Sequence, residues 1–266
     1  MSKQKPFGKC ALCGKECELT FEHIPPREAF NKMPAKPVSG ETVKNDRMET
    51  PWDLHGLKYN NQQKGMGLYS LCKKCNNDTG SWYGDPYTEF AYGAFSVLSN
   101  TLPQNASAIE FQQISPLYIF KQIVSMFCSI NNPNNKKMDE LRRFVLDKNS
   151  NSFNKSKYRI QMYFTKSPLM KYAPYSVLMI KAENDIVIAE VSEITAAPFG
   201  FILYFNPTDQ IPYKGINITD FADFTFDEKV DMGFPICIYE MNDILPAMYR
   251  SKEEIAKTVN ENKKRI

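Results

Sequence analysis

The segments Cys10-Ala11-Leu12-Cys13 and Cys72-Lys73-Lys74-Cys75 decide the fold that we expect for the first third of the chain. Each is a Cys-x-x-Cys turn, which places two thiolates on one side of a tight loop. Two such turns supply the four ligands of a closed, tetrahedral zinc site. A chance pairing of buried cysteines and a redox role for a single pair are the rival interpretations, and Cys17 is a nearby spare ligand. We therefore expect a structural zinc ion bound by Cys10, Cys13, Cys72 and Cys75.

Composition and charge set the broad class of the protein. The 266 residues are 42% hydrophobic and include 18 Phe and 14 Tyr, so the chain can bury a sizeable core. The formal net charge of +3 is too small to indicate nucleic-acid binding by itself, although residues 1–80 carry 13 Lys and Arg against 9 Asp and Glu. We expect no membrane span, because no run of about 18 apolar residues occurs. Seven cysteines, an odd number, favour a reducing compartment, so we expect a cytoplasmic protein.

The texture of the sequence changes near residue 84, which we take as a domain boundary. Residues 1–84 are rich in Pro and Gly and lack long regular periods, so a metal cross-link would help them to fold. Beyond this point, Asp85-Pro86 and Ser115-Pro116 are typical helix starts, and residues 138–146 predict a third helix. Runs rich in β-forming residues predict strands at 158–164, 175–180, 185–191 and 199–205, with weaker candidates at 215–218 and 234–239. A last helix is predicted to begin at Ser251.

The expected fold class is therefore α+β. A zinc-stapled module at residues 1–84 precedes a domain at residues 85–266 made of helices and a mainly antiparallel sheet. The role of the second domain is not indicated by any motif, and oligomerisation through it is left open.

Two further stretches complete a recognisable pattern around the cysteine pairs. Leu19-Thr20-Phe21-Glu22-His23-Ile24-Pro25-Pro26 lies between the pairs, and Asn76-Asn77-Asp78-Thr79-Gly80 follows the second pair. With the cysteines, they resemble the HNH endonucleases in their zinc-framed treble-clef (ββα-metal) form, over residues 8–80 or so. The resemblance implies a hairpin that carries the acidic-His pair, and a helix that begins at the second cysteine pair.

The resemblance also implies roles for individual residues. His23 would be the general base, Glu22 and Asn76 would bind a catalytic Mg²⁺ or Mn²⁺, and Asn77 is the neighbour that could replace Asn76. Histidine suits this chemistry because its unperturbed pKa lies near neutrality, and oxygen ligands suit a hard cation. The family's middle Asn is absent from its usual place, which Gly67 occupies; Asn60 or Asn61 would have to reach in from upstream.

The resemblance implies a metal-dependent endonuclease acting on nucleic acid, with DNA favoured over RNA and defence against foreign DNA as a family-level expectation. The alternative is a treble-clef zinc module that binds nucleic acid or protein without catalysis. A lone Glu-His dipeptide is more often structural than catalytic, and Asn76-Asn77 could simply cap a helix. His55, the second of the two histidines, is interpreted as a loop or structural residue.

Overall fold

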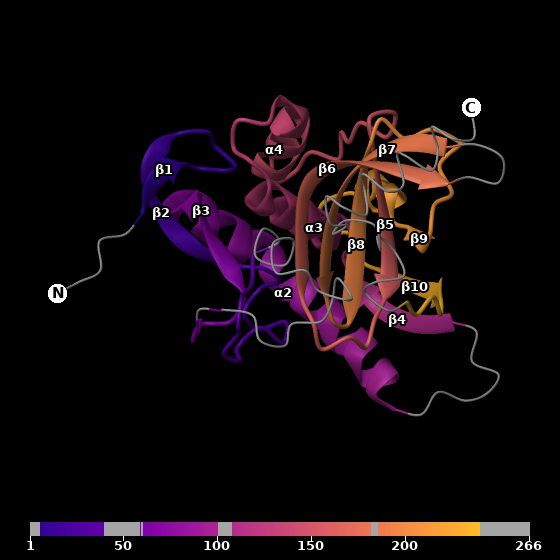
Figure 1. The fold of residues 1–266 in the computed structure, drawn as a ribbon. Helices are drawn as coiled ribbons and strands as arrows, with labels where there is room; N and C mark the ends of the chain where they lie inside the picture. The colour runs from indigo at the N-terminus through magenta and orange to yellow at the C-terminus, as the bar shows by residue number, and fades with distance from the viewer. Residues whose placement is uncertain (1–5, 40–58, 60, 101–107, 182–185, 240–266) are drawn as a thin grey trace.

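The computed structural model describes residues 6–39, 59, 61–100, 108–181 and 186–239. It is a mixed structure of helices and antiparallel sheets (Figure 1). The helix predicted to begin at Ser251 lies outside the described residues, as does His55.

The N-terminal part is a small antiparallel sheet followed by a long helix. Strands β1 (Phe7–Lys9), β2 (Glu16–His23) and β3 (Gly67–Cys72) lie in the order β1-β2-β3. The first cysteine pair occupies the turn between β1 and β2, and β3 runs directly into helix α2 (Lys73–Ser99). The second cysteine pair therefore joins the sheet to the helix, which brings it to the same end of the sheet as the first pair.

Helix α2 begins at Lys73, which confirms the helix start that the resemblance implies at the second cysteine pair; the other predicted start, at Asp85-Pro86, is wrong. Pro86 lies inside the helix, where its missing N–H removes one backbone hydrogen bond. The helix continues because its buried face repeats every three or four residues across the proline. This face consists of Cys75, Thr79, Tyr83, Tyr87, Phe90, Ala91, Ala94 and Leu98. Tertiary packing thus overrides the local signal.

The remaining helices agree with the sequence. Helix α3 (Pro116–Ile130) begins after Ser115, as predicted, and buries every residue except Tyr118. A short 3₁₀ turn, η1 (Lys136–Met138), leads into α4 (Asp139–Leu146) and together they account for the helix predicted at residues 138–146. A second 3₁₀ turn, η2 (Thr219–Asp223), packs against α3.

A five-stranded antiparallel sheet forms the main layer, in the order β6-β7-β8-β5-β9. Its strands are β5 (Tyr158–Phe164), β6 (Lys171–Lys181), β7 (Ile186–Ala196), β8 (Phe199–Phe205) and β9 (Ile216–Asn217). All five were predicted, although β6 and β7 extend beyond their predicted ranges. One face carries the aromatic side chains of β8 and packs against α2 and α3, which lie behind the sheet in Figure 1.

A further two-stranded sheet was predicted only in part. Strand β4 (Ala108–Ile114) pairs with β10 (Val230–Pro235), more than a hundred residues away. The sequence analysis missed β4 and placed the last strand at residues 234–239, about four residues too late. A pairing partner so distant in sequence leaves no local signal.

The predicted boundary at residue 84 falls in the middle of α2. A single buried core contains side chains from both sides of it, such as Leu71 from β3 and Phe127 from α3. The division into two domains therefore stays a prediction, with one continuous core across it.

Candidate metal centre and catalytic site

The four cysteines of the two Cys-x-x-Cys turns meet at one point. Their sulfur atoms all lie within 4.8 Å of one another, and the sulfurs of Cys13 and Cys72 are 3.9 Å apart. In a tetrahedral site with Zn–S bonds of about 2.3 Å, neighbouring sulfurs are about 3.8 Å apart. The four residues therefore fit a metal ion such as zinc. Cys17 is not a member of the cluster, and its Sγ lies 3.4 Å from the carbonyl oxygen of Lys15.

The thiols of Cys10 and Cys75 affect each other's protonation. Cys75 donates a hydrogen bond that lowers the pKa of Cys10 to about 4, against the opposing effect of burial. The same hydrogen bond, together with burial and the negative charge of Cys10, raises the pKa of Cys75. A thiolate at Cys10 thus keeps the neighbouring Cys75 protonated, and a zinc ion bound here would release that proton and stabilise the thiolates.

The chain around the cluster is held by backbone geometry and by one buried arginine. Gly14, just after the first pair, has a φ of +73°, a conformation that glycine adopts without steric cost. The backbone N–H of Cys72 donates to the sulfur of Cys10 (3.3 Å). Arg142 of α4 donates from Nε to the carbonyl of Ala11 (2.9 Å), inside the first turn. No local sequence signal indicates this contact across 131 residues.

Glu22 lies near the end of β2 with its side chain buried (8% exposed). Burial raises the pKa of its carboxyl to about 8. Among the described residues, no side chain or backbone group donates a hydrogen bond to this carboxyl or pairs with it. Neither oxygen of this carboxyl is among the fully buried side-chain atoms without a partner, so the carboxyl reaches the surface, where a cation has access to it.

His23, the last residue of β2, is oriented by the loop that precedes β3. Its Nε2 lies 2.7 Å from the carbonyl oxygen of Lys64. Because a carbonyl oxygen only accepts, Nε2 carries the proton, and the neutral ring then has its lone pair on Nδ1. Burial is the largest cause that lowers the pKa of His23, and the positive charges of Arg27 and Lys64 lower it further, against the effect of the Lys64 carbonyl. The neutral imidazole can accept a proton at Nδ1.

Asn76 in the first turns of α2 ties the helix to the strand that carries Glu22 and His23. Its Nδ2 donates to Thr20 Oγ1 (2.9 Å) and to the carbonyl of Phe21 (3.2 Å). Both donated bonds use the amide nitrogen, so the Oδ1 atom stays available as a ligand; no described residue donates to it. Asn77 is exposed and makes no such contact with β2, so the structure brings Asn76, and not Asn77, to this strand.

Asn31 is a residue of the site that the sequence analysis missed. It is buried (1% exposed), and its Nδ2 donates to the carbonyls of Pro25 and Met66, both at 2.7 Å. Its Oδ1 accepts from the backbone N–H of Met66, also at 2.7 Å. One amide thus joins the segment after His23 to the segment before β3. The spacing expected for the family's middle Asn directed attention to residues 60–67, so this upstream residue was overlooked.

Gly67, which occupies the place expected for that Asn, has a packing role of its own. It pairs with His23 across β2 and β3. A Cβ atom at this position would lie 2.0 Å from the carbonyl oxygen of Glu22, so no larger residue fits without moving the strand. The close approach of the two backbones therefore requires glycine here.

The main sheet also reaches the candidate site. The hydroxyl of Tyr172, on β6, donates to the carbonyl of Ile24, the residue after His23. The N–H of Ile24 in turn donates to the carbonyl of Met66 (3.1 Å). Residues on both sides of position 84 thus fix the backbone beside His23.

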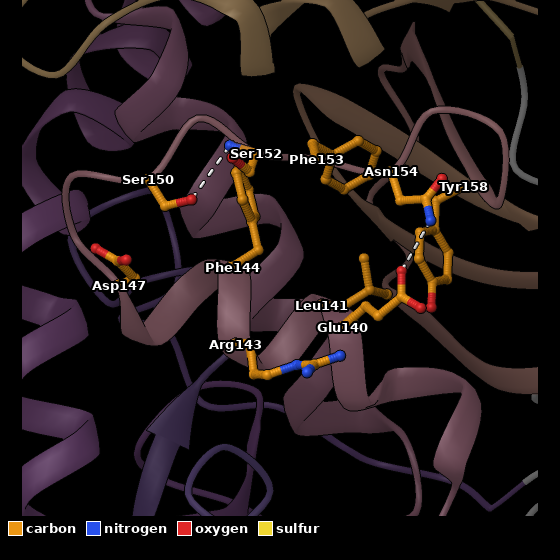
Figure 2. A pocket seen from close by; sticks show the side chains of 10 residues that line it. All are labelled: Glu140, Leu141, Arg143, Phe144, Asp147, Ser150, Ser152, Phe153, Asn154 and Tyr158. Atoms are coloured by element: carbon orange, nitrogen blue, oxygen red, sulfur yellow. Dashed lines mark hydrogen bonds between the residues drawn. The ribbon is translucent and has the colours of Figure 1, made fainter.

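A separate pocket of about 320 Å³ lies between α4 and the loop that leads to β5 (Figure 2). Its polar groups bond to one another: Asn154 donates to Glu140 (3.0 Å), and the N–H of Ser152 donates to Ser150 (3.1 Å), as the dashed lines show. None of the candidate catalytic residues lines this pocket. It is therefore not part of the site around His23.

Comparison of the chain with protein-family models, curated proteins and solved structures gives no match. The functional argument therefore rests on the residues and geometry described above. Within the described residues, no helix is both long enough and apolar enough to cross a membrane.

Proposed function

We propose that this protein is a metal-dependent endonuclease of the HNH type, which hydrolyses phosphodiester bonds in nucleic acid, with DNA favoured over RNA. His23 is the general base, and Glu22 and the Oδ1 atom of Asn76 hold a Mg²⁺ or Mn²⁺ ion. The cysteine cluster holds a structural zinc ion in a treble-clef module. Restriction of foreign DNA is the biological role that this activity suggests.

The reaction that we assign to these residues follows from their protonation. Nδ1 of His23 removes a proton from a water molecule as that water attacks the phosphorus atom. The hydrogen bond from Nε2 to the Lys64 carbonyl holds the ring in the required tautomer and stabilises the charge that develops on it. The positive charges of Arg27 and Lys64, which act on His23, would attract a phosphate group. When bound, the divalent cation stabilises negative charge on the phosphate and the leaving oxygen.

The observation that carries the proposal is the arrangement around the end of β2. Glu22, a carboxyl to which no described residue donates a hydrogen bond, directly precedes His23 in β2, and the His23 ring bonds to the Lys64 carbonyl. An amide from another element (Asn76) bonds to the two residues just before them. A carboxylate oxygen and an amide oxygen near the histidine are ligands of the kind that a hard cation prefers.

Cleavage of supercoiled plasmid by the purified, zinc-loaded protein tests the proposal. We expect nicked and linear products with added Mg²⁺ or Mn²⁺, and none with a chelator that removes only the weakly held ion. His23→Ala is expected to lower the rate by a factor of about 10² to 10⁴, the usual contribution of a general base. His55→Ala is the matched control and is expected to cleave as the parent does. The proposal fails if His23→Ala cleaves as fast as the parent protein.

The alternative is a zinc module that binds nucleic acid or a protein partner and has no activity. It is favoured if the protein retains DNA in a mobility-shift assay but cleaves neither DNA nor RNA with any divalent cation. The cleavage rates of Asn76→Ala and Asn77→Ala separate the endonuclease from the inactive module further. If Asn76 binds the catalytic cation, Asn76→Ala lowers the cleavage rate more than Asn77→Ala does.

A further inference from the structure

Three aromatic rings form a row on the face of β2 and β3 that carries His23. Phe21 and His23 are two residues apart on β2, so they point to the same side of the sheet. Their ring centroids are 5.0 Å apart, and the two rings are nearly perpendicular (85°). Tyr69 lies opposite Phe21 in the register, and the centroids of these two rings are 5.4 Å apart. The row of Tyr69, Phe21 and His23 therefore ends at the candidate general base.

The middle ring of the row has its place because residue 67 is a glycine. Gly67 lies opposite His23, and a Cβ atom at this position would come within 2.9 Å of Phe21 Cε1. The Phe21 ring thus occupies the space that a side chain at position 67 would need. Phe21 is partly buried, whereas Tyr69 at the far end of the row is 49% exposed. Tyr69 is therefore the ring of the row that a ligand can cover.

Tyr69 differs from the other exposed tyrosines in its position and not in its exposure. A single exposed aromatic residue is ordinary on a protein surface. Tyr92 on α2 is equally exposed (49%), but it packs against Phe30 at 4.7 Å, in a different part of the fold. Within the part of the chain that the structure describes, Phe21 is the one ring in contact with Tyr69, and the Tyr69 hydroxyl forms no hydrogen bond. Tyr69 is thus linked to His23 through a single ring.

Two cations act at the same end of β2. Arg27 and Lys64 are exposed, and neither forms an ion pair with an acidic residue in the described ranges. Burial lowers the pKa of His23 most, and the positive charges of Arg27 and Lys64 lower it further, so both charges act on its ring. Aromatic rings beside cations are typical of sites for single-stranded nucleic acid, in which the cations attract the backbone and the rings stack on bases.

We propose that Tyr69 stacks on an unpaired base of the DNA strand whose phosphate group lies at His23. The inference rests on the proposed function, and it adds that the site takes a strand in which a base is free. Inside a duplex both faces of each base are covered by its neighbours, so a protein ring stacks on a base that is unpaired or extruded. The stacking ring lies beyond Phe21, which suits a base that is joined through its sugar to the phosphate at His23.

Fluorescence anisotropy with a labelled, short thymidine strand tests the inference on the full-length, zinc-loaded protein. No divalent cation is added, so binding is measured apart from cleavage. At a fixed salt concentration, Tyr69→Ala is expected to raise the dissociation constant roughly 5- to 150-fold, the range for the loss of one stacked base. Tyr69→Phe keeps the ring and should bind as the parent does. Tyr92→Ala is the matched control, because Tyr92 is equally exposed, and it should leave the dissociation constant unchanged.

Two other probes separate stacking from attraction of the phosphates. A strand of the same length without bases keeps the phosphate charges, so the parent should bind it more weakly, and Tyr69→Ala should bind the two strands alike. A duplex closed at both ends offers no free base, so Tyr69→Ala should bind it as the parent does. The inference is overturned by an equal loss for strand and duplex, or by equal affinity of the parent for the strands with and without bases. The comparison of these two strands needs no variant, so it decides the matter even if Tyr69→Ala does not fold.

Failure of this inference is distinguishable from failure of the proposed function. If plasmid is cleaved but Tyr69→Ala binds the thymidine strand as tightly as the parent, the inference alone fails. If Tyr69→Ala weakens binding of the strand but no cation supports cleavage, the endonuclease proposal fails and the stacking role of Tyr69 stands.

Discussion

Asn31→Ala is the perturbation that examines most directly how the loop around His23 is held. The substitution removes three hydrogen bonds, to the carbonyls of Pro25 and Met66 and from the N–H of Met66. A hydrogen bond contributes about 1 kcal/mol net, and more when a buried partner is left unsatisfied. Because Asn31 is buried, we expect the free energy of unfolding to fall by about 3 kcal/mol, or a factor of roughly 150 in the unfolding constant.

Urea unfolding of the zinc-loaded protein measures this loss, with Asn77→Ala as the control for an exposed asparagine. The control is expected to change the free energy of unfolding by less than about 0.5 kcal/mol. Asn31→Asp is a stricter version, because a carboxylate keeps the shape and can accept from Met66 N–H but cannot donate to the two carbonyls. It should be at least as destabilising as alanine. If either Asn31 variant were as stable as the control, the role assigned to this amide would be refuted.

Three further predictions concern the zinc cluster, the sheet contact and a buried lysine. Cys72→Ser should abolish stoichiometric zinc in metal analysis and reduce the amide NMR dispersion of the N-terminal module. Cys17→Ser, which lies outside the cluster, should retain both. Equal zinc content in the two variants would contradict the assignment. Tyr172→Phe removes the hydrogen bond to the Ile24 carbonyl beside His23. It should therefore speed amide exchange at Ile24 and lower the turnover number more than it changes the KM. An unchanged exchange rate would show that the hydroxyl contact does not hold this backbone. Lys121 is fully buried, and burial lowers its pKa in the folded protein to about 8. Between pH 8 and 10.5 the unfolded chain therefore binds more protons than the folded protein, so the free energy of unfolding of the parent, relative to that of Lys121→Met, should rise across this window by up to roughly 3 kcal/mol. A difference that does not change with pH would be inconsistent with a lowered pKa.

The sequence predicted those parts of the fold that have a local cause. The strands at 158–164 and 199–205 match their predicted ranges because they are short, strongly β-forming runs. The start of α3 follows from Ser115-Pro116, since proline is favoured in the first helical turn. The same rule failed at Asp85-Pro86, where the face of α2 that packs into the core continues through the proline. A local signal cannot show which of two helix starts the core will favour.

The candidate site was predictable to the extent that its residues follow one another closely. The two Cys-x-x-Cys turns predicted that the four thiols converge, because this spacing suits a tetrahedral metal ion, and the four sulfur atoms lie within 4.8 Å of one another. Arg142 and Tyr172 each donate one hydrogen bond from a distant element to a backbone carbonyl near the site, and Asn31 makes three hydrogen bonds to the backbone of Pro25 and Met66. Such contacts place no constraint on neighbouring residues, so they leave no pattern in one sequence. They became visible only when the fold placed them beside the two cysteine turns and β2.

The central claim is that one divalent cation binds beside His23, held by Glu22 and Asn76. Addition of Mn²⁺ to the zinc-loaded protein tests it by paramagnetic broadening of histidine ring signals in the NMR spectrum. The chain has two histidines, so His55→Gln identifies the signal of His23. The account predicts that substoichiometric Mn²⁺ broadens the His23 ring in the parent protein, and that Glu22→Gln and Asn76→Ala need much more Mn²⁺ for the same effect. A His23 signal that stays sharp in the parent, or that broadens equally in all three proteins, would contradict it.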